Sequence, residues 1–426
     1  MKIFPCLASV AYRKISVILL VLLLAGIAMA PIVGAADPVQ RGNERYIDIS
    51  KAESVALMNI REVASMSSEY ESWKDATVVL STTYYDLNDE KTAYAFDVLT
   101  DMQYAGYIIV SATQDNYPAL ELSRGERPGE KASARSRSAH EVDSFAAKKG
   151  FAAGSHKPVY LGGTFFYEKY ELVDTNNKKQ MDVIVDLNNH KVIDLADESA
   201  VIPVSIDKKS STGNLKVKSP EIKKQWDLQD SAIEQLSADT RTVTGVMAKG
   251  GTSFIDNVPN YAWYIGCSPT ASAMVLGYWK NMGYSNYPSG PTLIAELASA
   301  MGTSQTWPLN GATWPWNIAS GINTVSSNHG YSYIYSFSRP DDAWATIKSE
   351  IDADRPFVIS MLHGGVAADS NTNQAYGEHS VACIGYMEGT TTENRWVTIY
   401  DTWDTGRSHL LQYQNWWNAQ ETYVRP

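Results

Sequence analysis

The chain contains little cysteine and no excess of positive charge. Only three of its 426 residues are cysteine, and one of them, Cys6, lies in the N-terminal segment, so the rest keeps only Cys267 and Cys383. Two cysteines do not build a disulfide-stapled scaffold, although they leave one bridge possible. The formal net charge is −11, without a basic cluster. Because an acidic chain repels phosphate backbones, we expect no nucleic-acid partner.

Motifs for cofactors are also missing. No group of His, Cys, Asp or Glu has zinc-ligand spacing, no glycine-rich phosphate loop follows a strand, and no calcium loop is present. The sequence therefore predicts no metal and no cofactor.

Long apolar runs are limited to one, at residues 15–36. Three basic residues precede or open it: Lys2, Arg13 and Lys14. Gly34-Ala35-Ala36 offers small residues for cleavage before Asp37, so residues 1–36 are typical of an export signal peptide. The alternative is an uncleaved anchor, since a run of this length can span a bilayer. In both cases we expect a secreted or extracytoplasmic protein. A membrane is a partner only if the signal peptide is not cleaved and remains as an anchor.

The remaining composition is that of a globular protein, with 44% hydrophobic and 19% charged residues, and the length suggests two or three domains. Helical spacing of apolar residues predicts a helix at 50–66, with Ser50 and Glu53 as a capping box. Short β segments follow at 77–85, 93–99 and 106–112. We assign residues 37–122 to one piece, a helix plus an antiparallel sheet.

Two polar stretches divide the chain further. Residues 123–150 are rich in Ser, Arg, Lys and Glu and indicate an exposed linker. Residues 151–206 form a second β-rich piece, with strands at 160–173, 181–186 and 190–195. Residues 207–250 are again polar, apart from a short helix that the pattern near 231–236 allows, and indicate a second linker, which is a plausible place for proteolytic cleavage.

The composition changes at residue 251, and ten of the twelve tryptophans lie beyond it. In Gly266-Cys267-Ser268-Pro269, the glycine permits a tight approach and the proline suits a first helical turn. The apolar stretch that follows indicates a buried helix, which places Cys267 at its N-terminus. There the helix dipole favours a thiolate, the form in which cysteine acts as a nucleophile.

A thiolate nucleophile needs an imidazole, and His379 is the best candidate among seven histidines. It opens a strand-like run that pairs with the next strand, 395–400, as a hairpin. Asp401 ends that second strand, where it can accept a hydrogen bond from the far nitrogen of His379 and orient the ring.

These three segments together resemble the C39-like branch of the papain-like cysteine peptidases, over residues 251–426. The resemblance implies an α+β, papain-like fold, with a central nucleophile helix against an antiparallel sheet. It also implies Cys267 as nucleophile, His379 as general base and acid, and Asp401 as orienter, acting on a protein or peptide substrate.

One position departs from the family pattern. The family places an oxyanion-hole Gln about six residues before the nucleophile, where this chain has Tyr261. One donor is the main-chain N–H of Cys267. The candidates for the second are four nearby side chains: Tyr261, Trp263, Asn257 and Asn260.

The front of the chain is similar, more loosely, to the propeptide of streptopain-type peptidases. Its matching segments are 93–97, 106–112 and 117–120. The resemblance implies an N-terminal α+β prodomain that acts as an intramolecular inhibitor, so the enzyme is made as a zymogen and activated by a cut within 207–250.

Other interpretations stay open. Cys267 can be a buried structural cysteine, or bridge to Cys383, although Cys383 lies about 13 Å along the strand from His379. His363 is the rival base and Asp404 the rival acid, while His329 and His409 look like ordinary surface or loop residues. The ten tryptophans beyond residue 251 could line a peptide-binding cleft, but large aromatic side chains more often pack in a core or under a lid. As functions, a transglutaminase-like acyl transferase and a decayed binding protein on the same fold remain alternatives.

Overall fold

The computed structural model describes residues 45–196, 214–238, 251–305, 311–332, 335–340, 343–362, 378–416 and 418–426. The expected export signal at 1–36 lies outside the described residues. We call the described chain up to residue 238 the front half and the chain from residue 251 the C-terminal region. No described helix is long and apolar enough to cross a membrane.

The front half opens with the expected helix, α2 (Ile49–Met66). Its N-cap is Asp48, whose carboxylate accepts the main-chain N–H of Lys51 at 2.7 Å. The predicted capping box at Ser50 and Glu53 is therefore wrong, because the helix begins before Ser50. A 3₁₀ helix, η1 (Ser68–Trp73), follows.

Two groups of antiparallel strands make up the sheet of the front half. The first is β1 (Thr77–Tyr85), β2 (Lys91–Thr100), β3 (Gln103–Ser111) and β4 (Ala119–Ser123). It confirms the strands predicted at 77–85, 93–99 and 106–112. The second is β5 (Ala152–Tyr160), β6 (Phe166–Val173), β7 (Lys179–Asp186) and β8 (Val192–Asp194).

The strand predicted at 160–173 is interrupted by a turn. There the main-chain N–H of Phe165 donates to the Gly162 carbonyl, and Thr164 has a positive φ of 68°. This turn, residues 161–165, reaches the C-terminal region, where the Gly163 N–H donates to the Asn415 carbonyl.

The segment predicted as a linker at 123–150 contains a helix, α3 (Ala132–Lys148). Its buried positions, Ser138, Val142 and Ala146, lie four residues apart, so the helix packs by one narrow stripe. The polar residues on its other faces gave the segment the composition of a linker.

The second predicted linker, 207–250, contains helix α5 (Asn214–Ala238). Ile222, Trp226 and Gln229 are buried at intervals of three or four residues. The Trp226 indole donates to the Asn116 carbonyl at 2.8 Å, which ties α5 to the sheet of the front half. The flanking residues 207–213 and 239–250 lie outside the described chain.

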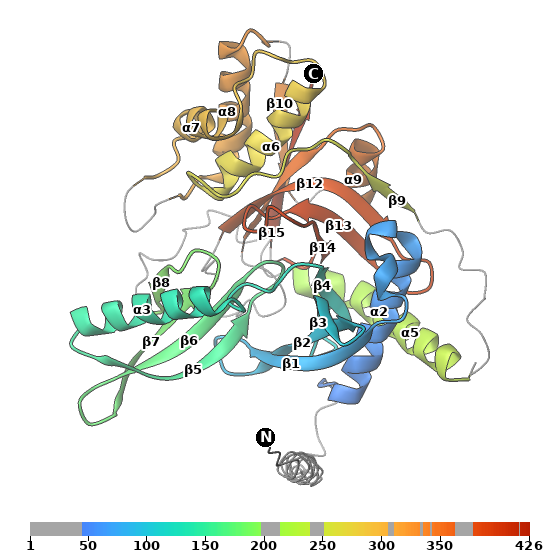
Figure 1. The fold of residues 1–426 in the computed structure, drawn as a ribbon, viewed down its shortest axis with the longest axis vertical. Helices are drawn as coiled ribbons and strands as arrows, with labels where there is room; N and C mark the ends of the chain where they lie inside the picture. The colour runs from blue at the N-terminus through green and yellow to red at the C-terminus, as the bar shows by residue number, and fades with distance from the viewer. Residues whose placement is uncertain are drawn as a thin grey trace, which may run out of the picture. The chain divides into compact units, whose positions relative to one another are not determined.

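The C-terminal region contributes four described helices and seven strands. Its helices are α6 (Cys267–Asn281), α7 (Gly290–Met301), α8 (Pro315–Asn328) and α9 (Trp344–Ile351). Its strands are β9 (Thr252–Phe254), β10 (Tyr335–Pro340), β11 (Phe357–Leu362), β12 (Glu378–Glu388), β13 (Arg395–Tyr400), β14 (His409–Gln412) and β15 (Asn418–Arg425). The predicted helix start at Cys267 and the β12–β13 hairpin are confirmed. Figure 1 shows α6, α7 and α8 gathered on one side of these strands.

One sheet runs through both parts of the chain. Among the described residues its order is β10-β15-β11-β12-β13-β14-β4-β3-β2-β1-β5-β6-β7-β8, with β9 added to β12. The halves meet where β14 pairs with β4, Leu410 opposite Leu122. Ser123 donates to the Ser408 carbonyl at this junction, 285 positions along the chain. The mixed α and β composition predicted from the sequence is thus confirmed.

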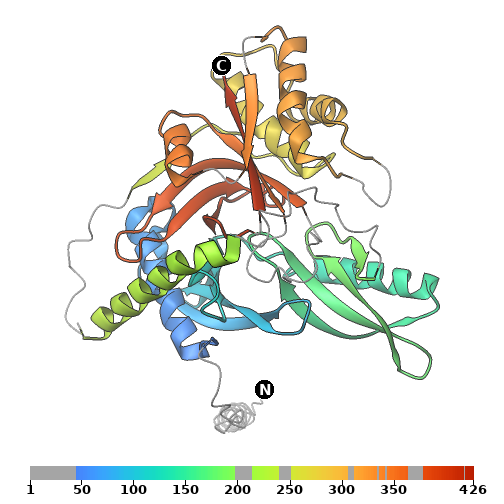
Figure 2. The ribbon, with the colours of Figure 1, turned by 180° about the vertical axis from the view of Figure 1, so that it is seen from behind.

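A second junction lies at the turn of the β12–β13 hairpin, residues 389–394. The buried carboxylate of Glu62 on α2 accepts hydrogen bonds from the Thr391 N–H, the Thr392 N–H and the Thr392 hydroxyl. The side chain of Gln225 on α5 donates to the Glu393 carbonyl of the same turn. Seen from behind in Figure 2, α5 lies beside this hairpin.

Candidate active site

Cys267 is the first residue of α6, and the glycine before it sets how the chain enters the helix. Gly266 has a φ of 98°, and a Cβ on it would lie 2.6 Å from the Gly311 carbonyl oxygen. Only glycine fits this backbone and this approach. Residues 268–279 of α6 are buried. Cys267 as a whole residue keeps some exposure at the end of the helix, but its thiol group is buried.

The thiol of Cys267 lies against strand β12. The main-chain N–H of Ser380 donates to its sulfur, as does Ser268. The Ser380 hydroxyl also lies 2.8 Å from that of Ser268 and 2.9 Å from that of Ser360. The start of α6 is thereby joined to β11 and to the strand that carries His379.

The pKa of Cys267 is raised to about 11, first by burial and then by the neighbouring Glu378 carboxylate. This differs from the expectation that the helix N-terminus lowers the pKa. A helix dipole contributes about 0.3–1 kcal/mol, less than one pKa unit, so desolvation outweighs it. In this state the sulfur is a neutral thiol at physiological pH. Burial also raises the pKa of Glu378, to about 8.

The ring of His379 is held on two sides by the segment just after β13. Its Nε2 lies 2.8 Å from the main-chain oxygen of Asp401, and its face stacks on the Trp403 indole at a centroid distance of 5.4 Å. Since a carbonyl only accepts, Nε2 carries the proton. Trp263 stacks on the other face of Trp403. The edge of Phe165, from the 161–165 turn of the front half, meets the ring of His379.

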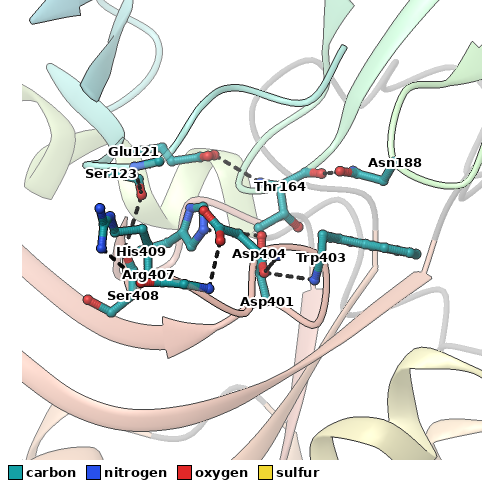
Figure 3. A network of polar contacts seen from close by, with 12 residues as sticks. Glu121, Ser123, Thr164, Asn188, Asp401, Trp403, Asp404, Arg407, Ser408 and His409 are labelled. Atoms are coloured by element: carbon teal, nitrogen blue, oxygen red, sulfur yellow. Dashed lines mark hydrogen bonds and ion pairs between the residues drawn. The ribbon is translucent and has the colours of Figure 1, made fainter. Parts of the chain in front are cut away.

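The side chain of Asp401 is engaged elsewhere. One carboxylate oxygen accepts the main-chain N–H groups of Trp403 and Asp404, both at 2.9 Å. The other lies 3.2 Å from Nε2 of His409. Figure 3 shows this carboxylate and His409 in one network with Glu121 of the front half. The residue that contacts His379 is therefore the expected one, but the contacting atom is its main-chain oxygen.

No hydrogen bond joins the Cys267 sulfur to the His379 ring among the described contacts. The Ser380 side chain points to α6, and successive side chains of a strand project to opposite faces, so His379 leaves β12 on the other face. Burial lowers the pKa of His379 to about 4, despite the opposing effect of Asp401. Thiol and imidazole are both neutral in this arrangement.

Two of the oxyanion-hole candidates lie far from the sulfur. The hydroxyl of Tyr261 accepts the Gly290 N–H and lies beside Gly277, ten residues along α6. At 1.5 Å per residue that position is about 15 Å from Cys267. The carbonyl of Asn257 accepts from Asn281, at the far end of α6.

The other two candidates lie in the segment that approaches residues 401–404. Asn260 donates its side-chain amide to the Asp404 carbonyl. Trp263 packs against Gly311, which in turn contacts Gly266 next to the nucleophile. Among the described candidates, Trp263 is thus the side chain placed beside the start of α6.

The remaining candidate residues lie away from the contact between Cys267 and β12 or outside the described residues. Cys383 is buried and unbridged, its thiol donating to the Gly385 carbonyl, so the two described cysteines form no disulfide. His363 lies outside the described residues. His329 pairs with Glu296 at 2.6 Å. Asp404 accepts the N–H of Gly406 through its carboxylate.

The sequence-based analysis missed four residues around the site: Phe165, Glu378, Trp403 and His409. His409 was taken as an ordinary surface or loop residue, which is wrong, because it is 2% exposed on β14. The signal that was available is the Asp-x-Trp spacing, which places Trp403 two residues after Asp401. Phe165 and His409 reach the site through tertiary contacts that leave no local pattern.

A cavity of about 640 Å³ is lined by residues of both the front half and the C-terminal region, Asp401, Trp403 and Asp404 among them. Its lining includes charged groups of both signs: Glu121, Arg124, Arg127, Asp401, Arg407 and His409. Among the described residues, no cluster of three or more His, Cys, Asp or Glu side chains has the geometry to hold a metal ion.

Comparison with known proteins agrees with the resemblance inferred from the sequence. Residues 255–424 match the family described as Peptidase_C39 like. This match confirms the resemblance for the C-terminal region. A comparison with curated proteins finds no match.

Solved structures give weaker likenesses. One is a C39-like peptidase from Bacillus anthracis, 16% identical, with a TM-score of 0.31, covering 41% of this chain and 98% of that one. Another is a fragment of prointerpain A from Prevotella intermedia, 14% identical, with a TM-score of 0.28, covering 64% of this chain and 98% of that one. At these scores neither likeness supports an argument about fold or function.

Proposed function

We propose that the C-terminal region is a thiol endopeptidase and that the chain is its inactive precursor. The observation that carries the proposal is the convergence of three parts. A cysteine begins a buried helix, that helix start is bonded to β12, and β12 carries a histidine whose far nitrogen is held by Asp401. These are the parts of a cysteine nucleophile, its base and an orienter.

In the proposed reaction, the Cys267 thiolate attacks the peptide carbonyl and His379 takes the thiol proton. The tetrahedral oxyanion is stabilised by the main-chain N–H of Cys267, with the Trp263 indole as the second donor. His379 then protonates the departing amine, and water attacks the acyl-enzyme with the same imidazole as base.

The inhibited state follows from the contacts around the site. The rings of Phe165, from the front half, and His379 meet at nearly a right angle, and His379 leaves β12 on the face opposite to Ser380, which contacts α6. A pKa of about 11 for Cys267 and about 4 for His379 leaves no thiolate–imidazolium pair. We propose that the front half is the inhibitory prodomain. Displacing it would let water reach both groups and let the ring turn toward the sulfur.

Activation in this proposal is a cut outside helix α5. Residues 207–213 and 239–250 flank that helix, whose buried Trp226 ties it to the front half. We favour a cut within 239–250, which separates the front half with α5 from the C-terminal region. The proposal also takes residues 1–36 as an export signal, so a secreted protein whose mass shows that it begins at Asp37 would support it.

The test uses the full chain with a specific protease site inserted between residues 239 and 250. After cutting, the proposal expects hydrolysis of a general protein substrate by the wild-type chain and none by a Cys267→Ser variant prepared in parallel. Incorporation of a labelled amine into the substrate without net cleavage would instead indicate acyl transfer. A correctly cut chain that does neither would leave a binding protein on a decayed peptidase fold.

A further inference from the structure

Among the described residues, the four-residue turn at 401–404 supplies two contacts to the ring of His379. The main-chain oxygen of Asp401 accepts from Nε2, and the Trp403 indole stacks on the ring. A small change in this turn therefore moves both the hydrogen-bond acceptor and the aromatic cover of the imidazole.

The turn does not hold its shape through backbone preference alone. Thr402 has a φ of 71°, an unfavourable conformation for a β-branched residue. The strain is opposed by three contacts. Two are the N–H groups of Trp403 and Asp404 donating to one oxygen of the Asp401 carboxylate, and the third is the Trp263 N–H donating to the Thr402 carbonyl.

The second oxygen of that carboxylate lies 3.2 Å from Nε2 of His409, a close polar contact between two buried groups that does not have hydrogen-bond geometry. His409 is 2% exposed and its backbone is fixed in the sheet, opposite Ile399 of β13 and Ser123 of β4. It therefore provides a rigid support for an otherwise movable side chain. The charged or titratable groups near it are Asp401, His379 and, from β4, Glu121.

We infer that His409 is a positioning residue for His379. His409 supports the Asp401 carboxylate, and the carboxylate holds the strained turn (Figure 3). This turn presents its Asp401 carbonyl and its Trp403 indole to the imidazole of His379. The catalytic meaning of this support rests on the proposed peptidase function, but the support itself is a property of the precursor and can be measured without activity.

The experiment is nitrogen-15 NMR of the intact chain with labelled histidine. The His379 signal is identified by its loss in His379→Gln, and His140→Gln, an exposed site on α3, is the matched control. In the wild type we expect His379 as the Nε2–H tautomer, with that proton slow to exchange with water. His409→Leu removes the polar contact to Asp401 and should speed this exchange by about tenfold or more, which corresponds to about 1.4 kcal/mol.

Two further variants separate positioning from general damage to the fold. The amide of His409→Gln reaches Asp401 and should restore slow exchange, whereas His409→Asn is one methylene shorter and should behave like the leucine variant. An unchanged His379 signal in both the Leu and Asn variants would overturn the inference, as would equal loss in Asn and Gln. If the expected pattern appears but the cut chain hydrolyses nothing, the peptidase proposal fails and the positioning role stands.

Discussion

Cys267 of the intact chain is expected to react slowly with a small thiol reagent at neutral pH, and to gain reactivity up to unusually high pH. With its pKa near 11, about one thiol in a thousand is ionised at pH 8, against roughly a quarter for an unperturbed cysteine. The rate should therefore be on the order of a hundredfold below that of a free thiol.

The sign of the pH dependence follows from the direction of the shift. A raised pKa favours the protonated thiol in the folded chain, so the alkylation rate should rise about tenfold per pH unit through pH 8–10 and level off only near 11. The assay is iodoacetamide labelling read by peptide mass, which separates Cys267 from buried Cys383. A plateau near pH 8.5 would refute the argument that burial and Glu378 suppress the thiolate.

Three substitutions test the contacts around the site. Phe165→Ala should speed solvent exchange of the His379 Nε2 proton in the intact chain by about tenfold or more, because it removes the ring that meets the imidazole. An unchanged exchange rate would show that Phe165 does not shield His379. Glu62→Ala leaves three donors of the β12–β13 turn without their acceptor. It should lower the free energy of unfolding in urea by about 2–5 kcal/mol, whereas Glu53→Ala, at an exposed site on the same helix, should lower it by about 0.5 kcal/mol or less. Similar losses in the two variants would contradict the view that Glu62 joins α2 to this turn. After cutting, Asp401→Asn keeps an oxygen for the two turn N–H groups and should retain about tenfold more activity than Asp401→Ala, and a ranking of kcat in the opposite order would assign orientation to the negative charge.

The parts of the fold that the sequence predicted correctly are those with strong local patterns. Helix α2 and strands β1 to β3 follow from helical and alternating spacing, and the start of α6 follows from the Gly-Cys-Ser-Pro segment. Helix α3 was missed, and of α5 only a short piece near 231–236 was expected, because each helix buries only a narrow stripe. In α5 that stripe includes the buried amides of Gln225 and Gln229, which a hydrophobic pattern does not detect.

The joining of the two halves into one sheet left no trace in the sequence. The pairing of β4 with β14 brings together residues about two thirds of the chain apart, and neither strand is long enough to show a pattern of its own. In the sequence, Glu62 is indistinguishable from an ordinary glutamate on a helix surface, because its partners are main-chain groups of a distant turn.

For the site, the order Cys, His, Asp and the local elements were the basis on which the three residues were predicted. Which atom of Asp401 meets His379 was not predictable, because that depends on the turn at 401–404 and on His409 behind it. The thiol pKa was expected to be lowered from the helix alone. The opposing desolvation comes from packing against β12, which only the three-dimensional structure reveals.

The most direct test of the central claim is labelling by a thiol-reactive peptide inhibitor before and after a cut between residues 239 and 250. The account predicts little labelling of the intact chain, rapid labelling of Cys267 after the cut, and none in a cut Cys267→Ala variant. Labelling that persists in that variant, or a Cys267 that stays inert once the front half has been separated, would contradict a cysteine peptidase held inactive by its own N-terminal part.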